Sequence, residues 1–290
     1  MRRAYYPIVI AIFSVFYLSC KKDFSRGAPS SGTLDNVHAY LKIIDVSPNF
    51  ASIVNGKDTF NILVNGKKIN GYSLSYNVMY PYAVNPSTAT YTTTYAMVEA
   101  GNNKIQLAVG VNKPDSVVYV TLNENMIGGG RYSLLITDSI MKGMKDSSKI
   151  FVRDNYADNS VIPSNIQTTG YITIRFADLV LNDTGKVDLY SYQRNSALYS
   201  NIRPDSITNF VAIGYNYSMG DTMYVMRSLP AGTKVNPTIS QRTILSKIVI
   251  DKSVTGTNIT PIGRAFTFIY KGDFNVTSGS KAKSIFTYIH

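Results

Sequence analysis

From Tyr40 onward, apolar side chains recur at every second position. In 104–111 apolar residues alternate with Lys104 and Gln106, and in 171–177 they alternate with Thr173 and Arg175. A period of two predicts half-buried antiparallel strands, with one face on a core and the other in water. We therefore expect Thr173 and Arg175 to face solvent.

Turn signals separate these runs at short intervals, and no long segment has the 3.6-residue period of an amphipathic helix. The clearest signals are Val64-Asn65-Gly66, Ala100-Gly101-Asn102, Gly128-Gly129-Gly130 and Asn182-Asp183-Thr184-Gly185. Val, Ile, Thr, Tyr and Phe abound, as is typical of strands. The pattern predicts an all-β protein.

Three landmarks repeat in the same order. Residues 42–45 align with 175–178, 98–101 with 229–232, and Gly130-Arg131 with Gly263-Arg264, at offsets of 133, 131 and 133 residues. The repeat predicts two tandem immunoglobulin-like antiparallel β-sandwich domains, 38–155 and 168–290, joined by a linker at 156–167. The alternative is one larger sandwich in which the two halves share sheets.

The N-terminal 37 residues have a different composition. Met1-Arg2-Arg3 precedes fifteen uncharged residues, Ala4 to Leu18, as in a secretory signal peptide, which we assign to 1–19. Leu18-Ser19-Cys20 resembles the lipobox of Gram-negative lipoproteins, so Cys20, the only Cys of the chain, is the predicted lipid attachment site. The alternative is an inert Cys within an ordinary signal sequence. Residues 20–37, rich in Ser, Gly and charge, predict a flexible tether behind a membrane anchor.

The order of turns in the repeat resembles a known family. Asp45-Val46-Ser47-Pro48-Asn49, a strand ending in Val64-Asn65-Gly66, and a later Ala-Gly hairpin are similar to the bacterial domain-of-unknown-function family 4397. The second copy has Val180-Leu181 and Tyr190-Ser191-Tyr192 at the corresponding places. The resemblance implies secreted or lipid-anchored immunoglobulin-like domains, often in tandem, and implies no catalytic residues.

Composition argues against common catalytic and metal sites. The chain has 290 residues, one Cys and two His. His38 lies at the tether boundary and His290 is the last residue, so we expect both at the surface and predict no catalytic residue, no cofactor and no enzyme. Gly128-Gly129-Gly130 precedes a strand rather than a helix, which favours a hairpin turn over a phosphate cradle.

Acidic residues leave two possibilities open. A carboxylate pair for glycoside hydrolysis could form from residues distant in sequence. The segment 154–159 could hold a calcium ion through Asp154 and Asp158, although it matches no calcium-loop spacing. We predict no metal site and interpret the segment as a solvated linker.

Charge and aromatic content bear on partners. Of the 29 basic side chains, 27 remain without Arg2 and Arg3, against 18 acidic ones, a net charge of +9. The basic residues are scattered, so we expect no nucleic-acid binding. Tyr is abundant, with 22 residues, and Tyr80 and Tyr82 fall in a segment that reads as an exposed loop. These two are the predicted ligand contacts, although Tyr is also a favoured strand residue.

Together these features predict a lipoprotein of the outer membrane or cell surface of a Gram-negative bacterium, anchored through Cys20. Its expected role is non-enzymatic surface interaction, which covers adhesion, envelope structure, and glycan or envelope-protein binding. One alternative is a surface glycan-degrading enzyme or an accessory subunit of a glycan-uptake system. Another is a passive spacer.

Overall fold

The computed structural model describes residues 35–50, 59–81, 95–110, 117–137, 149–156, 170–215, 220–230, 239–250 and 263–290. Strands account for nearly all regular structure in these residues, with one short 3-10 turn, η4 (Ile239–Gln241), so the all-β prediction is confirmed. No helix in this part of the chain has the length and apolar character needed to span a membrane. The predicted signal peptide, Cys20, Tyr82, Asp158 and most of the tether and the linker lie outside the described residues.

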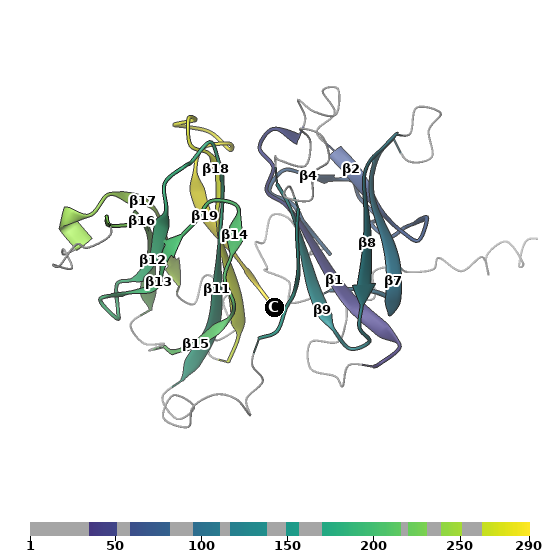
Figure 1. Cartoon of the computed structure of the whole chain (residues 1–290), viewed down its shortest axis with the longest axis horizontal. Coiled ribbons are helices and arrows are strands. Elements are labelled where there is room, and N and C mark those ends of the chain that lie inside the picture. The colour runs from purple at the N-terminus through teal and green to yellow at the C-terminus, as the bar shows by residue number, and fades with distance from the viewer. Residues whose placement is uncertain are drawn as a thin grey trace, which may run out of the picture.

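The N-terminal half forms a sandwich of two sheets (Figure 1). Its inner sheet has the order β10-β9-β1-β5, with β6 also paired to β1, and consists of β1 (His38–Asp45), β5 (Met79–Tyr80), β6 (Ala96–Glu99), β9 (Arg131–Ile136) and β10 (Lys149–Arg153). Its outer sheet has the order β3-β2-β7-β8, with β4 paired to β2, and consists of β2 (Thr59–Val64), β3 (Lys67–Lys68), β4 (Leu74–Ser75), β7 (Gly101–Val109) and β8 (Val117–Met126).

The C-terminal half repeats this arrangement. Its inner sheet has the order β14-β11-β18-β19, with β15 also paired to β11, and consists of β11 (Tyr171–Leu181), β14 (Ser206–Ile207), β15 (Val211–Gly214), β18 (Ala265–Asp273) and β19 (Ser284–Ile289). Its outer sheet has the order β13-β12-β16-β17, and consists of β12 (Val187–Ser191), β13 (Ser196–Ile202), β16 (Asp221–Arg227) and β17 (Ile244–Ile250). No described strand pairs across the two halves, which argues against the alternative in which they share sheets.

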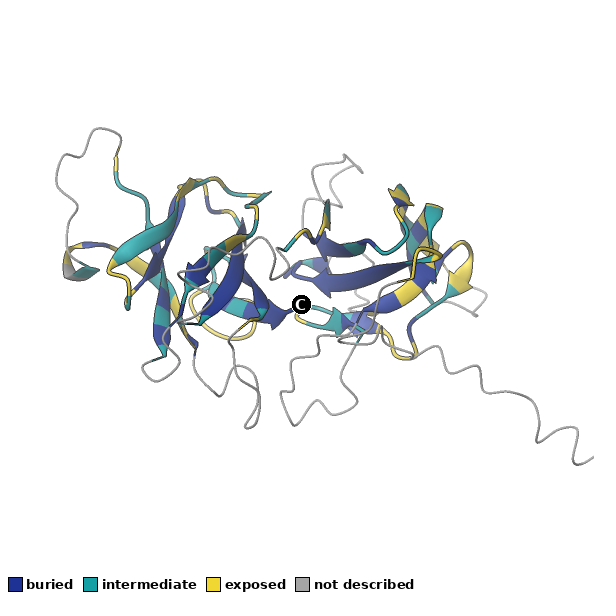
Figure 2. Ribbon diagram, turned by 90° about the horizontal axis from the view of Figure 1, so that it is seen from below, coloured by how far each residue is buried: buried dark blue, intermediate teal, exposed yellow. Residues whose placement is uncertain are grey.

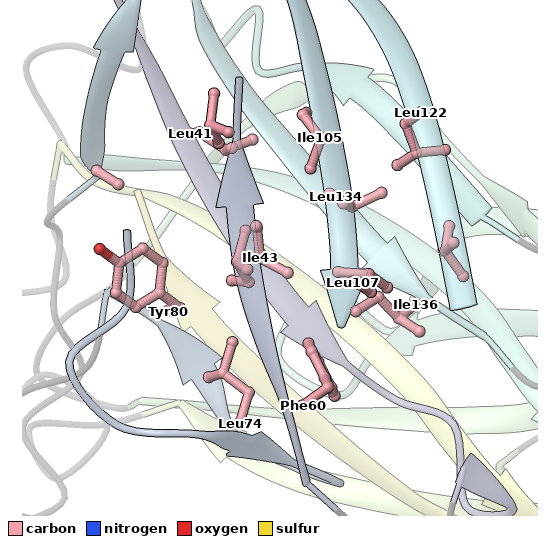
Figure 3. Packing of buried hydrophobic residues seen from close by; sticks show 14 of the residues in the cluster. Leu41, Ile43, Phe60, Leu74, Tyr80, Ile105, Leu107, Leu122, Leu134 and Ile136 are labelled. Carbon is pink, nitrogen blue, oxygen red and sulfur yellow. The ribbon is translucent and has the colours of Figure 1, made fainter. Parts of the chain in front are cut away.

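Each sandwich has a core of its own between its two sheets. In the N-terminal core, residues from β1, β2, β7, β8 and β9 interdigitate, and these include Leu41, Ile43, Phe60, Ile105, Leu107, Leu122, Leu134 and Ile136 (Figure 3). A separate cluster, with Phe176, Leu189, Val225 and Phe268 among its members, fills the C-terminal sandwich. In β8 buried and exposed residues alternate as the period of two predicts.

The two inner sheets depart from the prediction in two ways. Most strand pairs are antiparallel, but β1 pairs with β9 and β11 pairs with β18 in parallel. Moreover, β11 is buried from Tyr171 to Val180 and β18 from Ala265 to Gly272, so neither strand has a face in water. The expectation that Thr173 and Arg175 face solvent is therefore wrong. The inner sheets pack against each other, giving four layers in which both inner sheets are covered on both sides (Figures 1 and 2).

The sequence repeat matches the structure residue for residue at one of its three landmarks, because Lys42 and Arg175 lie at equivalent positions of β1 and β11. The Gly-Arg pairs at 130–131 and 263–264 both lie at the entry to the corresponding strands β9 and β18, but they are one residue out of step: Tyr40 N–H bonds to the Gly130 carbonyl, whereas Thr173 N–H bonds to the Arg264 carbonyl. The third landmark includes Ala231 and Gly232, outside the described residues. Gly128-Gly129-Gly130 joins β8 to β9, as expected for a turn between strands, but these strands belong to different sheets, so the hairpin prediction is wrong and the turn crosses from the outer to the inner sheet.

Candidate functional site

The candidate site is the contact between the two inner sheets. Along β1, Leu41 and Ile43 point into the N-terminal core, whereas Lys42 and Ile44 alternate with them and face the other sandwich. One part of this contact is apolar, and its buried members are Ile44, Val46, Leu135, Ala177, Leu179, Ile269 and Tyr288. The other part is polar and contains Lys42, Tyr95, Ser133, Asp154, Arg175, Thr267, Tyr288 and His290, which we call the polar cluster.

An ion pair between the halves lies at the centre of the polar cluster. Arg175 Nη2, on β11, is 2.6 Å from Asp154 Oδ1, which follows β10, and both side chains are at most 1% exposed. Burial raises the pKa of Asp154, but His290, Arg175 and Ser133 lower it by more, so the net pKa lies below the ordinary range. Because Asp154 is ionised, Arg175 supplies the compensating charge that an isolated buried carboxylate would lack.

Two hydrogen-bonded paths also lead from Arg175 to Asp154. In the first, Arg175 Nη2 donates to Tyr288 Oη at 2.9 Å, Tyr288 donates to Ser133 Oγ at 3.1 Å, and Ser133 donates to Asp154 Oδ2 at 2.7 Å. Each step of this path joins residues that are buried. The path crosses from the C-terminal to the N-terminal sandwich between Tyr288 and Ser133, so it connects the two halves directly.

The second path passes through His290. Arg175 Nε donates to Thr267 Oγ1 at 2.7 Å, and that hydroxyl lies 2.7 Å from His290 Nε2. His290 Nδ1 lies 2.5 Å from Tyr95 Oη, which donates to Asp154 Oδ2 at 3.0 Å. Burial lowers the pKa of His290 to about 3, so the ring is neutral at pH 7. The network is satisfied when Thr267 donates to Nε2 and Nδ1–H donates to Tyr95.

Lys42 is the second cation of the polar cluster. It is fully buried, its Nζ donates to the carbonyl of Ile289 at 2.7 Å, and it lies 4.5 Å from the centre of the Tyr95 ring. Burial, opposed by the charge of Asp154 and reinforced by that of Arg175, lowers the pKa of Lys42 to about 7. The cluster therefore holds one firm ion pair and one amine that is readily deprotonated.

The two halves contribute equivalent residues to this contact. Tyr95 immediately precedes β6 and Phe210 immediately precedes β15, and these strands pair with β1 and β11 at matching positions. The Arg175 guanidinium lies 4.5 Å from the Phe210 ring, the same separation as between Lys42 and Tyr95. Asp154 and His290 are equivalent as well, because each follows the strand that pairs with β9 or β18.

Thr267, His290 and Asp154 together resemble a hydroxyl–imidazole–carboxylate arrangement. His290 Nε2 is 2.7 Å from Thr267 Oγ1, and its Nδ1 is 3.5 Å from Asp154 Oδ2. A nucleophile must reach substrate, however, and the Thr267 and His290 side chains are completely buried. Thr267 Oγ1 also accepts from Arg175 Nε. The chemistry available to this cluster is therefore mutual hydrogen bonding that holds the two sheets in one register.

Several predicted positions need correction. His290 is buried rather than at the surface, whereas His38 is partly exposed and contacts Asp35. Tyr80 does not lie in an exposed loop as expected of a ligand contact, because its ring packs in the N-terminal core and its hydroxyl donates to the carbonyl of Ile69 (Figure 3). Asp154 lies in the polar cluster rather than in a solvated linker, and the described residues contain no group of three or more carboxylate, His or Cys side chains that could bind a metal.

Comparison with known proteins adds no function. No family model and no curated protein matches the chain. The resemblance to family 4397 therefore stays a prediction.

Proposed function

We propose that the protein is a lipid-anchored component of the outer membrane or cell surface that acts by non-enzymatic interaction with other surface molecules. The observation that carries this proposal is that the side chains of the polar cluster are used to join the two sandwiches. The residues most suited to acid–base or nucleophilic chemistry, Thr267, His290 and Asp154, are buried and bonded to one another between the sandwiches. A rigid body of this kind suits presentation of a surface.

The proposed location at the outer membrane or cell surface rests on the sequence. The basic start, the uncharged run to Leu18 and the single Cys at position 20 support export followed by acylation of Cys20. Multiple acyl chains on one residue would give stable membrane anchoring. Replacing Cys20→Ser should abolish metabolic labelling with palmitate, while Ser25→Ala, five residues further on, should leave labelling unchanged. Persistent labelling of the Cys20 variant would show that lipid is attached elsewhere.

The interaction role is tested with the soluble fragment 24–290. The proposal expects the fragment to retain a glycan or an envelope protein in array and pull-down experiments, without converting it. Turnover of any polysaccharide by the fragment would favour the enzymatic alternative. Absence of binding to every glycan and envelope protein tested would favour the passive spacer.

A further inference from the structure

The outward face of the C-terminal outer sheet carries an aromatic and cationic patch. On β12, β16 and β17, Leu189, Val225 and Ile248 belong to or pack against the core, so alternate residues point away from it. These outward residues include Tyr190, Tyr224 and Lys247, which are neighbours across three adjacent strands. Tyr192 extends the same face, because its N–H bonds to the carbonyl of Thr222 on β16.

The tyrosines of this patch differ in exposure. Tyr192 is 61% exposed, Tyr224 is half-buried, and the centres of their rings are 6.3 Å apart. Tyr190 is buried, and its hydroxyl donates to the side chain of Asn195 in the following turn. Tyr190 therefore lies on the same face but is covered by its neighbours, while Tyr192 and Tyr224 present ring surface and hydroxyls to solvent.

The charge of this face is positive. Lys247, the cross-strand neighbour of Tyr224, is exposed and makes no ion pair with any described residue. Asp188 also points outward from β12, but Arg242 lies 2.5 Å from its Oδ2 and compensates its charge. The ammonium of Lys247 thus remains available to an anionic group beside the two rings.

The equivalent face of the N-terminal sandwich provides a comparison within the same molecule. There, β7 and β8 correspond to β16 and β17, and their outward cross-strand pairs are Lys104 with Asn123 and Gln106 with Thr121. These pairs contain a lysine but no aromatic ring. The two outer sheets share a backbone plan, so the tyrosines are not required by the fold itself.

We infer that the outward face of β12, β16 and β17 binds an acidic polysaccharide, with sugar rings stacked on Tyr192 and Tyr224 and a sugar carboxylate on Lys247. Tyrosine combines a flat apolar surface with a polar hydroxyl, which suits a sugar ring that has both apolar and hydroxyl-bearing faces. The three strands span about 10 Å, the length scale of a disaccharide. This inference rests on the proposed surface-interaction function and gives it a ligand class.

The experiment measures binding of the full-length protein, purified in detergent, to immobilised polygalacturonate, with dextran as the neutral polysaccharide. We expect binding to polygalacturonate that exceeds binding to dextran. Tyr192→Ala should weaken binding to polygalacturonate by about fivefold to tenfold. The double variant that combines Tyr192→Ala with Tyr224→Phe should also weaken it by about fivefold to tenfold. Lys247→Ala should weaken it by about threefold to fivefold. Tyr192 is exposed enough that its replacement leaves folding intact, as circular dichroism would verify.

Two matched variants separate a site from general attraction of a basic protein to a polyanion. Lys104→Ala removes the same charge from the other outer sheet, and Tyr72→Ala removes a tyrosine that is 86% exposed elsewhere. Both should bind like the wild type. Equal losses in Lys104→Ala and Lys247→Ala, equal binding to dextran, or no binding to polygalacturonate would each overturn the inference. Retention of an envelope protein in that last case would leave the proposed function standing.

Discussion

Lys42 and Arg175 are equivalent residues of the two halves, and each extends into the opposite sandwich. Lys42 Nζ donates to the carbonyl of Ile289 at 2.7 Å, and Arg175 Nη2 lies 2.6 Å from Asp154 Oδ1. Their chemical roles differ, because Arg175 balances an ionised carboxylate whereas Lys42 meets a carbonyl and has a pKa near 7. We therefore expect these equivalent positions to differ in their contribution to stability.

Arg175→Met should destabilise the protein far more than Lys42→Met. Without Arg175, Asp154 remains buried with no compensating charge, and loss of one partner of a buried pair costs about 3–5 kcal/mol. Lys42→Met loses the hydrogen bond to the Ile289 carbonyl and the contact of the ammonium with the Tyr95 ring, but it removes the cost of burying an amine, so we expect a change within about 1 kcal/mol. Urea unfolding at pH 7.5 measures both free energies of unfolding.

A double variant checks the cause. Adding Asp154→Asn to Arg175→Met removes the unpaired charge, so the pair should recover part of the lost stability. If the double variant is as unstable as the sum of the two single ones, the ion pair is not what Arg175 contributes. Equal losses for Lys42→Met and Arg175→Met would also contradict the assignment.

His290 should make the folded state acid-sensitive. Its folded-state pKa is lowered from 6.5 to about 3, so the unfolded chain binds a proton that the folded chain rejects. The stability that the neutral ring contributes is fully present above pH 6.5 and is lost as pH falls toward 3, by up to about 1.4 kcal/mol per pH unit. His290→Gln cannot titrate in this window, so the stability difference between wild type and variant should shrink on acidification.

That difference, rather than the wild-type curve, is the quantity to measure. Asp178 acts in the opposite direction over much of the same pH window, as argued below. Chemical unfolding of wild type and His290→Gln at half-unit steps from pH 7 to pH 4 gives the difference directly. A constant offset between the two curves would show that His290 has an ordinary pKa in the folded protein.

The alternation of residues predicted the strands and could not predict what covers their second face. In β8 the polar positions of the pattern are in water, whereas Arg175 of β11 has the same alternation and is buried. Alternation with a period of two shows only that neighbouring side chains point to opposite faces of a strand. The second face is covered by a sheet from the other half of the chain, which local pattern does not encode.

The polar cluster left one signal in the sequence. Lys42 and Arg175 align within the repeat, and each stands in an otherwise apolar stretch, so a cation recurs where a strand has apolar neighbours on both sides. Asp154 and His290 gave no such signal, since they are brought to the cluster by the strands that precede them, β10 and β19. Tyr80 was misplaced because Pro81 and the following Asn85-Pro86-Ser87 suggested an exposed loop, whereas its ring completes the N-terminal core.

Asp178→Asn should stabilise the protein at alkaline pH. Asp178 is completely buried on β11, and burial raises its pKa from 3.8 to about 7. Because the folded-state pKa is raised, the favourable contribution is present below pH 3.8 and is lost as pH rises through 7. An asparagine keeps the shape without the charge, so the gain should reach up to about 4 kcal/mol above pH 7 and vanish near pH 4.

Thermal unfolding at pH 4 and pH 8.5 distinguishes this effect from a general one. Asp35→Asn is the matched control, because Asp35 lies on the surface beside His38. The control should show no gain at pH 8.5. A gain in Asp178→Asn that is equal at both pH values would mean that the carboxylate charge is not its source.

Gly128→Ala should destabilise the N-terminal sandwich through its turn. A Cβ at position 128 would lie 1.9 Å from the backbone oxygen of Asn36, which precedes β1. The turn and the start of β1 would have to separate, which strains the hydrogen bonds from Gly129 N–H to the His38 carbonyl and from Tyr40 N–H to the Gly130 carbonyl. We expect a loss of about 2 kcal/mol or more in the free energy of unfolding.

Gly71→Ala is the control for this change. No atom lies within 4 Å of a Cβ placed at Gly71, so its replacement should alter stability by less than about 0.5 kcal/mol. Hydrogen exchange of the amides of Gly129 and Tyr40 reports where the strain falls, and both should exchange faster in Gly128→Ala only. Wild-type stability in Gly128→Ala would mean that the chain before β1 does not pack against this turn in solution.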